Sequence, residues 1–323
     1  MHLAISLNIA AATGETVLDF SRISKFVRHA EAAGVDMIVI SDTADGPSIS
    51  PFEATTLLAA LATVTDRIGL VASASALAHQ PYNLARRFAS LDIISHGRIG
   101  WHATMAQGSR EAANFSRPEG FSGTDFRRRA EEYIGIVRGL WQGWDADALL
   151  FDKSGGRFHD PVKMHLLDHK GEFFSVRGPL NVARSPQGTP VLVLSGLSEP
   201  DLDIAARNAD VILLESGSAE SAKIRFDDLR RRATAAGRHP DAVKVLTNIS
   251  FGSDDTRAAT ADRLESQFRT RSCDGFNIQL RCSMLDEFTD RVLPVLRQRG
   301  LVREGYRGTT LRSHLELGRG GDR

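Results

Sequence analysis

The residues just before one predicted helix are suited to binding an anion. Ser195, Gly196 and Ser198 precede a segment that begins with acidic residues, and the free N–H groups of a helix N-terminus attract negative charge. A simpler interpretation is a helix cap, with Ser198 as the N-cap and Glu199 in the first turn. The sequence leaves both interpretations open.

Three successive arginines, Arg127, Arg128 and Arg129, lie in another predicted helix. A run of like charges usually forms a solvated face. Successive helical residues point in different directions, however, so one arginine is free to face a phosphate. Arginine binds phosphate through charge-assisted hydrogen bonds.

Two histidines and two cysteines have simpler explanations. His165 and His169 stand four residues apart, a spacing that on a helix would suit a metal ion, but a preceding proline and a following glycine argue against a helix. We therefore expect surface-loop histidines and no metal site. Cys273 and Cys282 flank the last predicted strand, and we expect buried structural thiols there.

Short apolar runs alternate with segments of helical periodicity along the chain. Strands are expected at Leu3–Ile9, Met37–Ile40, Ile68–Ala72, Arg98–Ala103, Val191–Leu194, Val211–Leu214, Val243–Ile249 and Phe276–Leu280. Strict alternation of strand and helix implies a parallel sheet with right-handed crossovers. Eight such units favour closure into a (β/α)8 barrel, that is, a TIM barrel of the α/β class.

We expect one barrel domain over residues 1–299. The segment Asp145–Pro190 breaks the alternation and is interpreted as an excursion after the fourth helix, packed on the barrel. The C-terminal tail, residues 300–323, is polar and glycine-rich and is expected to be partly disordered.

The barrel predicts where the chemistry lies, because active sites form at the C-terminal ends of the strands. Those ends carry Asp42, Ser73–Ser75, His102–Met105, Ser195–Ser198 and Glu215–Ser218.

Composition narrows the class of protein. The 323 residues include 40 Lys and Arg against 40 Asp and Glu, which argues against a nucleic-acid binder, since such proteins carry a basic excess. Only two cysteines occur, as is typical of a reducing compartment. We see no signal peptide and no apolar run of the ~20 residues that span a bilayer. The expectation is a cytoplasmic protein that binds neither nucleic acid nor membrane.

Several long stretches resemble one known family. They include RIGLVASAS (Arg67–Ser75), QPYNLARRFASLDIISHGRIGW (Gln80–Trp101), AEEYIGIVRGLWQGW (Ala130–Trp144) and DHKGEFFSVRGPLNVARSPQGTPVLV (Asp168–Val193). Read in order, they are similar to the bacterial-luciferase-like flavin-dependent monooxygenases. The most similar branch is that of the nitrilotriacetate, dibenzothiophene-sulfone and pristinamycin-synthase monooxygenases.

The resemblance implies an enzyme that binds reduced FMN supplied by a separate flavin reductase. Oxygen would add to the flavin C4a, and the resulting peroxide would insert one oxygen atom into a small organic substrate, so the cofactor carries the chemistry. The resemblance also implies a homodimer, or a heterodimer with a related barrel, formed through the second and third helices.

The same resemblance suggests cofactor-binding residues but identifies no catalytic residue. Asp42 matches a flavin-ring residue, and Ser73 matches a position whose turn often holds a non-proline cis peptide. His102 stands where the family has asparagine. Ser198 matches the family's serine after strand five, in agreement with an anion site there, and Arg127 stands where the branch has a tyrosine that binds the phosphate.

Departures from the branch leave two functions open. Met105 and Ala106 replace a polar pair, and Gly123 stands where the branch has a second phosphate ligand, a histidine. The region after strand seven is also short, since Phe251–Thr256 leads almost directly into the next helix, and in luciferase-like folds this region carries a mobile lid. One function is a working monooxygenase with a short or partner-supplied lid. The other is a catalytically degenerate paralogue that binds flavin or another ligand, or acts as a non-catalytic subunit.

Overall fold

Eight parallel strands close into a barrel in the computed structural model, which describes residues 1–12, 18–42, 48–105, 109–115, 119–252 and 257–320. The barrel strands are β1 (His2–Asn8), β3 (Met37–Ser41), β5 (Gly69–Ser73), β6 (Ile99–Thr104), β11 (Val191–Ser195), β12 (Val211–Leu214), β13 (Lys244–Ser250) and β14 (Gly275–Gln279). Because β1 pairs with both β3 and β14, the sheet has no free edge. The predicted (β/α)8 fold is confirmed, with each strand within one residue of its expected start.

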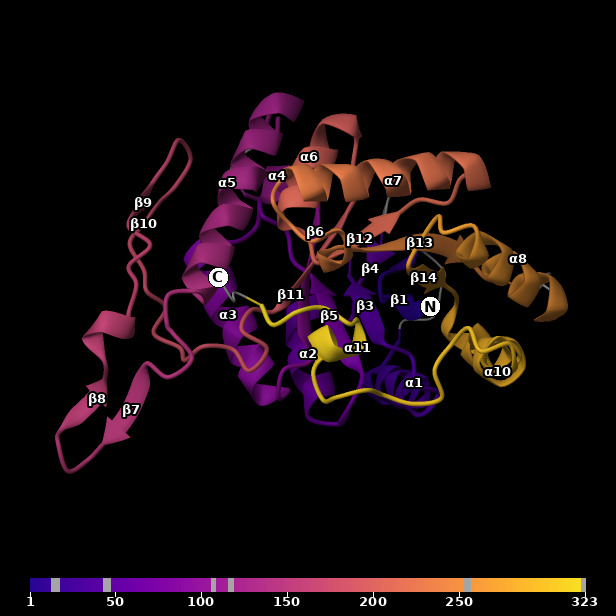
Figure 1. Ribbon diagram of the computed structural model, residues 1–323, viewed down its shortest axis with the longest axis horizontal. Coiled ribbons are helices and arrows are strands. Elements are labelled where there is room, and N and C mark those ends of the chain that lie inside the picture. Colours follow the sequence, from indigo (N-terminus) through magenta and orange to yellow (C-terminus); the bar gives the residue numbers. More distant parts are fainter. Residues whose placement is uncertain (13–17, 43–47, 106–108, 116–118, 253–256, 321–323) are drawn as a thin grey trace.

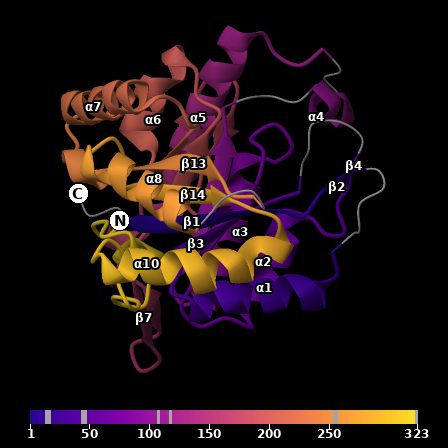
Figure 2. The ribbon, with the colours of Figure 1, turned by 90° about the vertical axis from the view of Figure 1, so that its right-hand side faces the viewer.

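Helices surround this barrel (Figures 1 and 2). They are α1 (Phe20–Ala32), α2 (Ala54–Ala62), α3 (Pro81–Ile94), α4 (Ser109–Asn114), α5 (Gly123–Trp141), α6 (Leu202–Asn208), α7 (Ala219–Ala235), α8 (Arg257–Arg269), α9 (Leu285–Glu287), α10 (Leu293–Gln298) and α11 (Leu311–His314). No helix in the described part of the chain combines the length and apolar character needed to cross a bilayer.

Helix α1 illustrates how the sequence sets these elements. The Asp19 carboxylate caps its start by accepting a hydrogen bond from the Arg22 N–H at 2.8 Å, which satisfies a free N–H group of the first turn. Ile23, Val27 and Ala30 recur at helical spacing and are fully buried against the barrel.

The lower part of the barrel interior is apolar. Alternate residues of the strands point inward and form one cluster: Ala4, Met37, Val39, Val71, Val191, Val193, Val211, Leu213 and Leu246. Leu311, Leu315 and Leu317 of the C-terminal segment belong to the same cluster.

The C-terminal segment therefore closes the base of the barrel. The Arg312 guanidinium, almost completely buried, pairs with Asp210 at 2.7 Å and donates to the Thr189 hydroxyl at 2.9 Å. The expectation of a partly disordered tail is wrong for residues 300–320, because three leucines fill the barrel base and an ion pair anchors them. The division at residue 299 stays a prediction.

The excursion after α5 has two parts with different surroundings. The hairpin of β9 (His169–Lys170) and β10 (Ser175–Val176) lies along α5, where the Glu132 carboxylate accepts from the N–H groups of Phe173 and Phe174, each at 3.0 Å. The hairpin of β7 (Leu149–Asp152) and β8 (Arg157–His159) projects away from the barrel (Figure 1). Phe151 and Phe158 at this hairpin are exposed and in edge-to-face contact.

The connection after β13, at the C-terminal face of the barrel, is short. Six residues, 251–256, separate β13 from α8, as the short strand-seven region predicted, and 253–256 lie outside the described residues. The strands β2 (Ala11–Ala12) and β4 (Ser48–Ile49) pair antiparallel after β1 and β3.

Candidate active site

Each barrel strand contributes one polar residue to the interior at its C-terminal end. We call these residues the polar ring: Ser6, Ser41, Ser73, His102, Ser195, Glu215, Asn248 and Asn277. Most lie two residues after an inward-facing apolar residue, such as Val71 before Ser73 or Leu246 before Asn248, and side chains two apart on a strand share a face. The ring therefore forms a polar layer above the apolar base.

His102 joins three strands of the ring. Its Nδ1 lies 2.7 Å from the Ser73 hydroxyl and its Nε2 lies 2.7 Å from the Ser195 hydroxyl. Burial lowers the pKa of His102 to about 4, so its imidazole is neutral at physiological pH. A neutral imidazole has one donor and one acceptor nitrogen. One serine therefore donates to the ring, and the other accepts and keeps its own hydrogen for a ligand.

A second chain of hydrogen bonds runs along the remaining strands of the polar ring, from β1 through β14 and β13 to β12. The amide of the buried Asn277 donates to the Ser6 hydroxyl and to the Asn248 carbonyl, both at 2.8 Å. The Asn248 amide donates in turn to the Glu215 carboxylate at 2.9 Å. The chain ends at this exposed side chain, the one carboxyl group of the polar ring.

Arg127 and Ser198 are brought together by Asp201, a buried carboxylate in the turn before α6. Asp201 accepts from Arg127 Nε at 2.8 Å and from the Ser198 N–H at 2.8 Å. Ser198 also caps this turn, so the N-cap interpretation is observed. Among the described residues, neither Nη group of Arg127 has a hydrogen-bond partner, which leaves them available to an anion.

The three arginines of α5 point in three directions. Arg128 pairs with Asp125 and Glu172 at the surface. Arg129 donates to the Ala76 carbonyl at 2.8 Å and lies over the Phe174 ring at 4.7 Å. A solvated face therefore accounts for Arg128 alone.

Asp42 forms a hydrogen bond with the backbone and none with a side chain of the polar ring among the described contacts. Its carboxylate accepts from the Ala54 N–H, at the start of α2, at 2.9 Å, and burial raises its pKa. The structure places it just past β3, next to the strand of Ser73, with no direct bond between them among the described contacts.

The peptide after Ser73 is trans, against the expectation of a cis bond. In the described residues the only cis peptide precedes Pro179. The Ala74 N–H donates to the His102 carbonyl at 3.1 Å, which continues the β5–β6 ladder in ordinary geometry.

The other sequence candidates lie away from the ring. His165 pairs with Asp145, and His169 pairs with Glu132, so the two histidines share no ligand position. Cys273 is buried, and Cys282 is half-buried. Met105 is buried beside the ring strands, whereas Ala106 lies outside the described residues.

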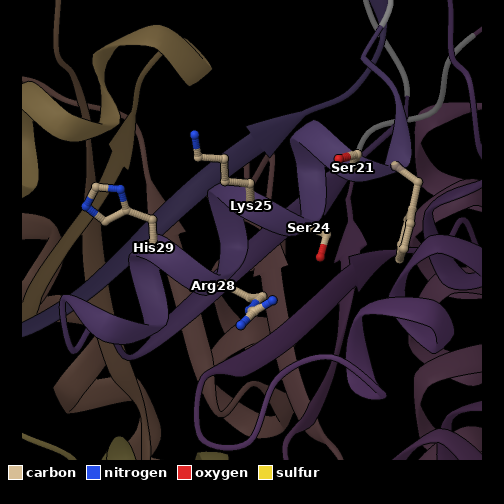
Figure 3. A pocket seen from close by; sticks show the side chains of 6 residues that line it. Ser21, Ser24, Lys25, Arg28 and His29 are labelled. Atoms are coloured by element: carbon tan, nitrogen blue, oxygen red, sulfur yellow. The ribbon is translucent and has the colours of Figure 1, made fainter.

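The surface hollows also lie elsewhere. One, of about 630 Å³, is lined by α1 alone, with Ser24, Lys25, Arg28 and His29 along one face of the helix (Figure 3). Another, of about 560 Å³, lies between α7 and α8 and is lined by Phe226, among other residues. Neither includes a strand-end residue of the ring, so the ring remains the candidate site.

Sequence reasoning gave Ser195 only a possible role in the anion-binding turn, placed Glu215 at a strand end without a role, and missed Ser6, Asn248 and Asn277. The signal was the period of two within each strand. A polar residue in phase with inward-facing apolar ones, near the end of a barrel strand, marks the ring.

Comparison with known proteins agrees with this architecture. The family model described as luciferase-like monooxygenase matches residues 1–304. N-acetyl-S-(2-succino)cysteine monooxygenase of Bacillus subtilis is 30% identical over an alignment of 414 positions, gaps included, which covers 98% of this chain and 94% of the relative. Nitrilotriacetate monooxygenase component A of Aminobacter aminovorans is 43% identical over 62% of this chain, but only 44% of that protein is covered.

Solved structures show the same fold. A riboflavin lyase, described with modified FMN and riboflavin, superposes with a TM-score of 0.87 at 25% identity, covering 98% of this chain and 96% of the other. EDTA monooxygenase from Chelativorans sp. BNC1 gives a TM-score of 0.87 at 24% identity, covering 99% and 98%. The resemblance seen in the sequence is confirmed, and the chain belongs to the luciferase-like monooxygenases, a family of flavin-dependent oxidoreductases.

Proposed function

We propose that this protein is the oxygenase component of a two-component system. It would take reduced FMN from a separate flavin reductase and insert one atom of O2 into a small organic substrate. The observation that carries the proposal is the Ser73–His102–Ser195 group at the mouth of a barrel of this family.

The residues present fit a flavin. One serine hydroxyl spends its hydrogen on neutral His102 and can only accept from a ligand, whereas the other keeps its hydrogen and can donate; this pair suits the alternating N–H and C=O groups of a flavin edge. Arg127, held by Asp201 through Nε, would bind the phosphate with its Nη groups. Asp42 and Ser198 are the remaining proposed contacts of the cofactor. When bound, reduced flavin supplies the electrons that activate O2.

The chain's own part is to hold the cofactor and keep water out. Trp101 faces outward from β6 and packs against Phe88 of α3 and Tyr133 of α5. Its indole N–H donates to the Ala74 carbonyl at 2.8 Å, which fixes the strand end that carries Ser73. A fixed, largely dry wall favours oxygen transfer over side reactions with water.

An anaerobic titration with reduced FMN tests the proposal. We expect saturable binding, tighter than that of oxidised FMN, at concentrations up to about 100 μM, a range that detects even weak affinities. No binding of reduced FMN in that range would overturn the proposal and favour the degenerate paralogue. Binding without oxygen transfer to any substrate would favour a non-catalytic subunit.

We also propose a dimer, with itself or a related barrel, through α2 and α3. Three apolar side chains at the ends of these helices, Val64, Ile93 and Ile94, are exposed by 36%, 37% and 52%, and a partner packed on α2 and α3 would cover them. Light scattering should give twice the 35.2 kDa chain mass. The mass of a single chain for the protein alone would contradict the homodimer.

A further inference from the structure

The polar ring divides into two halves with different chemistry. The residues proposed for the cofactor, Asp42, Ser73, His102 and Ser198, lie at the ends of β3, β5, β6 and β11. The strands β12, β13, β14 and β1 complete the barrel and carry Glu215, Asn248, Asn277 and Ser6. The cofactor proposal gives this second half no role.

In the second half, two asparagine amides hold the Glu215 carboxylate in place. Asn277 and Asn248, 1% and 6% exposed, have fixed amide orientations because each hydrogen bond leads to the next acceptor. Asn277 donates to Ser6 on one side and to Asn248 on the other, and Asn248 donates in turn to Oε1 of Glu215. Oε2 has no partner among the described residues, and the described ion pairs include none to Glu215.

Glu215 is the one acidic side chain of the polar ring, and the ring holds no basic side chain that could balance it. The other ring members are hydroxyls, amides and the neutral imidazole of His102. A carboxylate accepts hydrogen bonds but donates none, so its complement is a cation or a group with N–H donors. Hydrogen bonds between charged groups are also stronger than neutral ones.

We propose that Glu215 recognises the substrate and that the substrate class is a small organic amine, bound as its ammonium ion at Oε2. The proposal deepens the proposed function and rests on it, because Glu215 follows β12, the strand that pairs with β11 and so lies beside Ser195 of the Ser73–His102–Ser195 group. Binding of the amine itself does not depend on the flavin.

Glu215→Gln separates recognition from structure. Glutamine keeps an oxygen at Oε1 that can accept from Asn248, so the amide chain is preserved while the charge is lost. Glu220→Gln, at an exposed position in the first turn of α7, makes the same charge change outside the ring and serves as the matched control.

The test is calorimetric titration with hexylamine, 1-hexanol and hexanoate, with and without FMN. We expect hexylamine to bind at least about ten times more tightly than hexanoate, and Glu215→Gln to weaken hexylamine about tenfold or more while leaving hexanol unchanged. Glu220→Gln should keep the full preference. Equal binding of amine and acid, no measurable amine binding, or the same loss in both variants would overturn the assignment.

Flavin titrations keep the two proposals apart. Amine binding in a parent protein that binds no FMN would overturn the proposed function and leave this inference standing. FMN binding without an amine preference would do the reverse. A loss of FMN affinity in Glu215→Gln would assign Glu215 to the cofactor and overturn its role with substrate.

Discussion

His102 determines which of the Ser73 and Ser195 hydroxyls donates a hydrogen bond and which accepts one. Replacing it by phenylalanine removes both bonds and leaves the Ser73 and Ser195 hydroxyls without their ring partner. An unsatisfied polar group costs about 1–3 kcal/mol, so we expect His102→Phe to bind reduced FMN at least several-fold more weakly in an anaerobic titration. His102→Asn, which keeps a donor and an acceptor, should lose less. Equal affinity of His102→Phe and the parent would show that the group does not contact the cofactor.

Arg127 offers a second test at the scale of one residue. Removing its guanidinium should cost on the order of 1.5–3 kcal/mol of FMN affinity, the usual contribution of a charged hydrogen bond. Riboflavin lacks the phosphate and should bind Arg127→Ala and the parent equally. Arg128→Ala, a surface arginine on the same helix, is the control. Unchanged FMN affinity in Arg127→Ala would leave Arg127 only its pairing with Asp201.

Sequence reasoning at this scale found residues next to strand ends and missed those reached through long-range contacts. Ser73 and His102 follow directly from the strand positions. The Arg127–Asp201 pair joins residues 74 apart in the chain, and no local pattern predicts it. Asn248 and Asn277 were hidden inside runs that were interpreted by their apolar neighbours alone.

Among the elements, the C-terminal segment contributes directly to the barrel core. Leu315 is completely buried in the interior cluster. We expect Leu315→Ala to lower the free energy of unfolding by about 2–5 kcal/mol, the range for buried leucine truncations, measured by urea denaturation. Ile224→Ala, at a 62% exposed position on α7, should change it by less than about 0.5 kcal/mol. A Leu315→Ala variant as stable as the control would show that the segment does not seal the base.

The barrel elements could be predicted from the sequence because each strand is a short apolar run between helices. The C-terminal segment could not, because its leucines are interspersed with Arg312, His314 and Glu316 and read as polar. Only the open base of the barrel explains why those leucines are buried. The β7–β8 hairpin was also missed, since its apolar residues are exposed and follow no core pattern.

For the whole molecule, three histidines with lowered pKa values predict sensitivity to acid. Burial lowers the pKa of His2, His102 and His314 to about 4 each. Between pH 6.5 and 4 the unfolded chain binds protons that the folded chain does not, so stability is full above pH 6.5 and falls as the pH drops. Each group contributes about 1.4 kcal/mol per pH unit.

His314 allows this prediction to be isolated. Neither ring nitrogen has a side-chain partner, the ring lies 4.7 Å from that of Tyr306, and nearby Arg303 also opposes its protonation. Between pH 7 and pH 5, His314→Phe should lose about 2 kcal/mol less stability than the parent. The same loss in both proteins, measured by denaturation at each pH, would contradict a depressed pKa.

The closure of the barrel base by residues 311–317 has a consequence during protein synthesis. These residues leave the ribosome after all eight strands, and β1 cannot complete its pairing until β14 has emerged. Until then the nascent chain keeps its first strand unpaired on one side and the apolar interior of the base uncovered. Exposed apolar surface and open strand edges are what chaperones bind. We therefore expect the yield of folded protein in a cell to depend on chaperone supply as well as on the stability of the finished barrel.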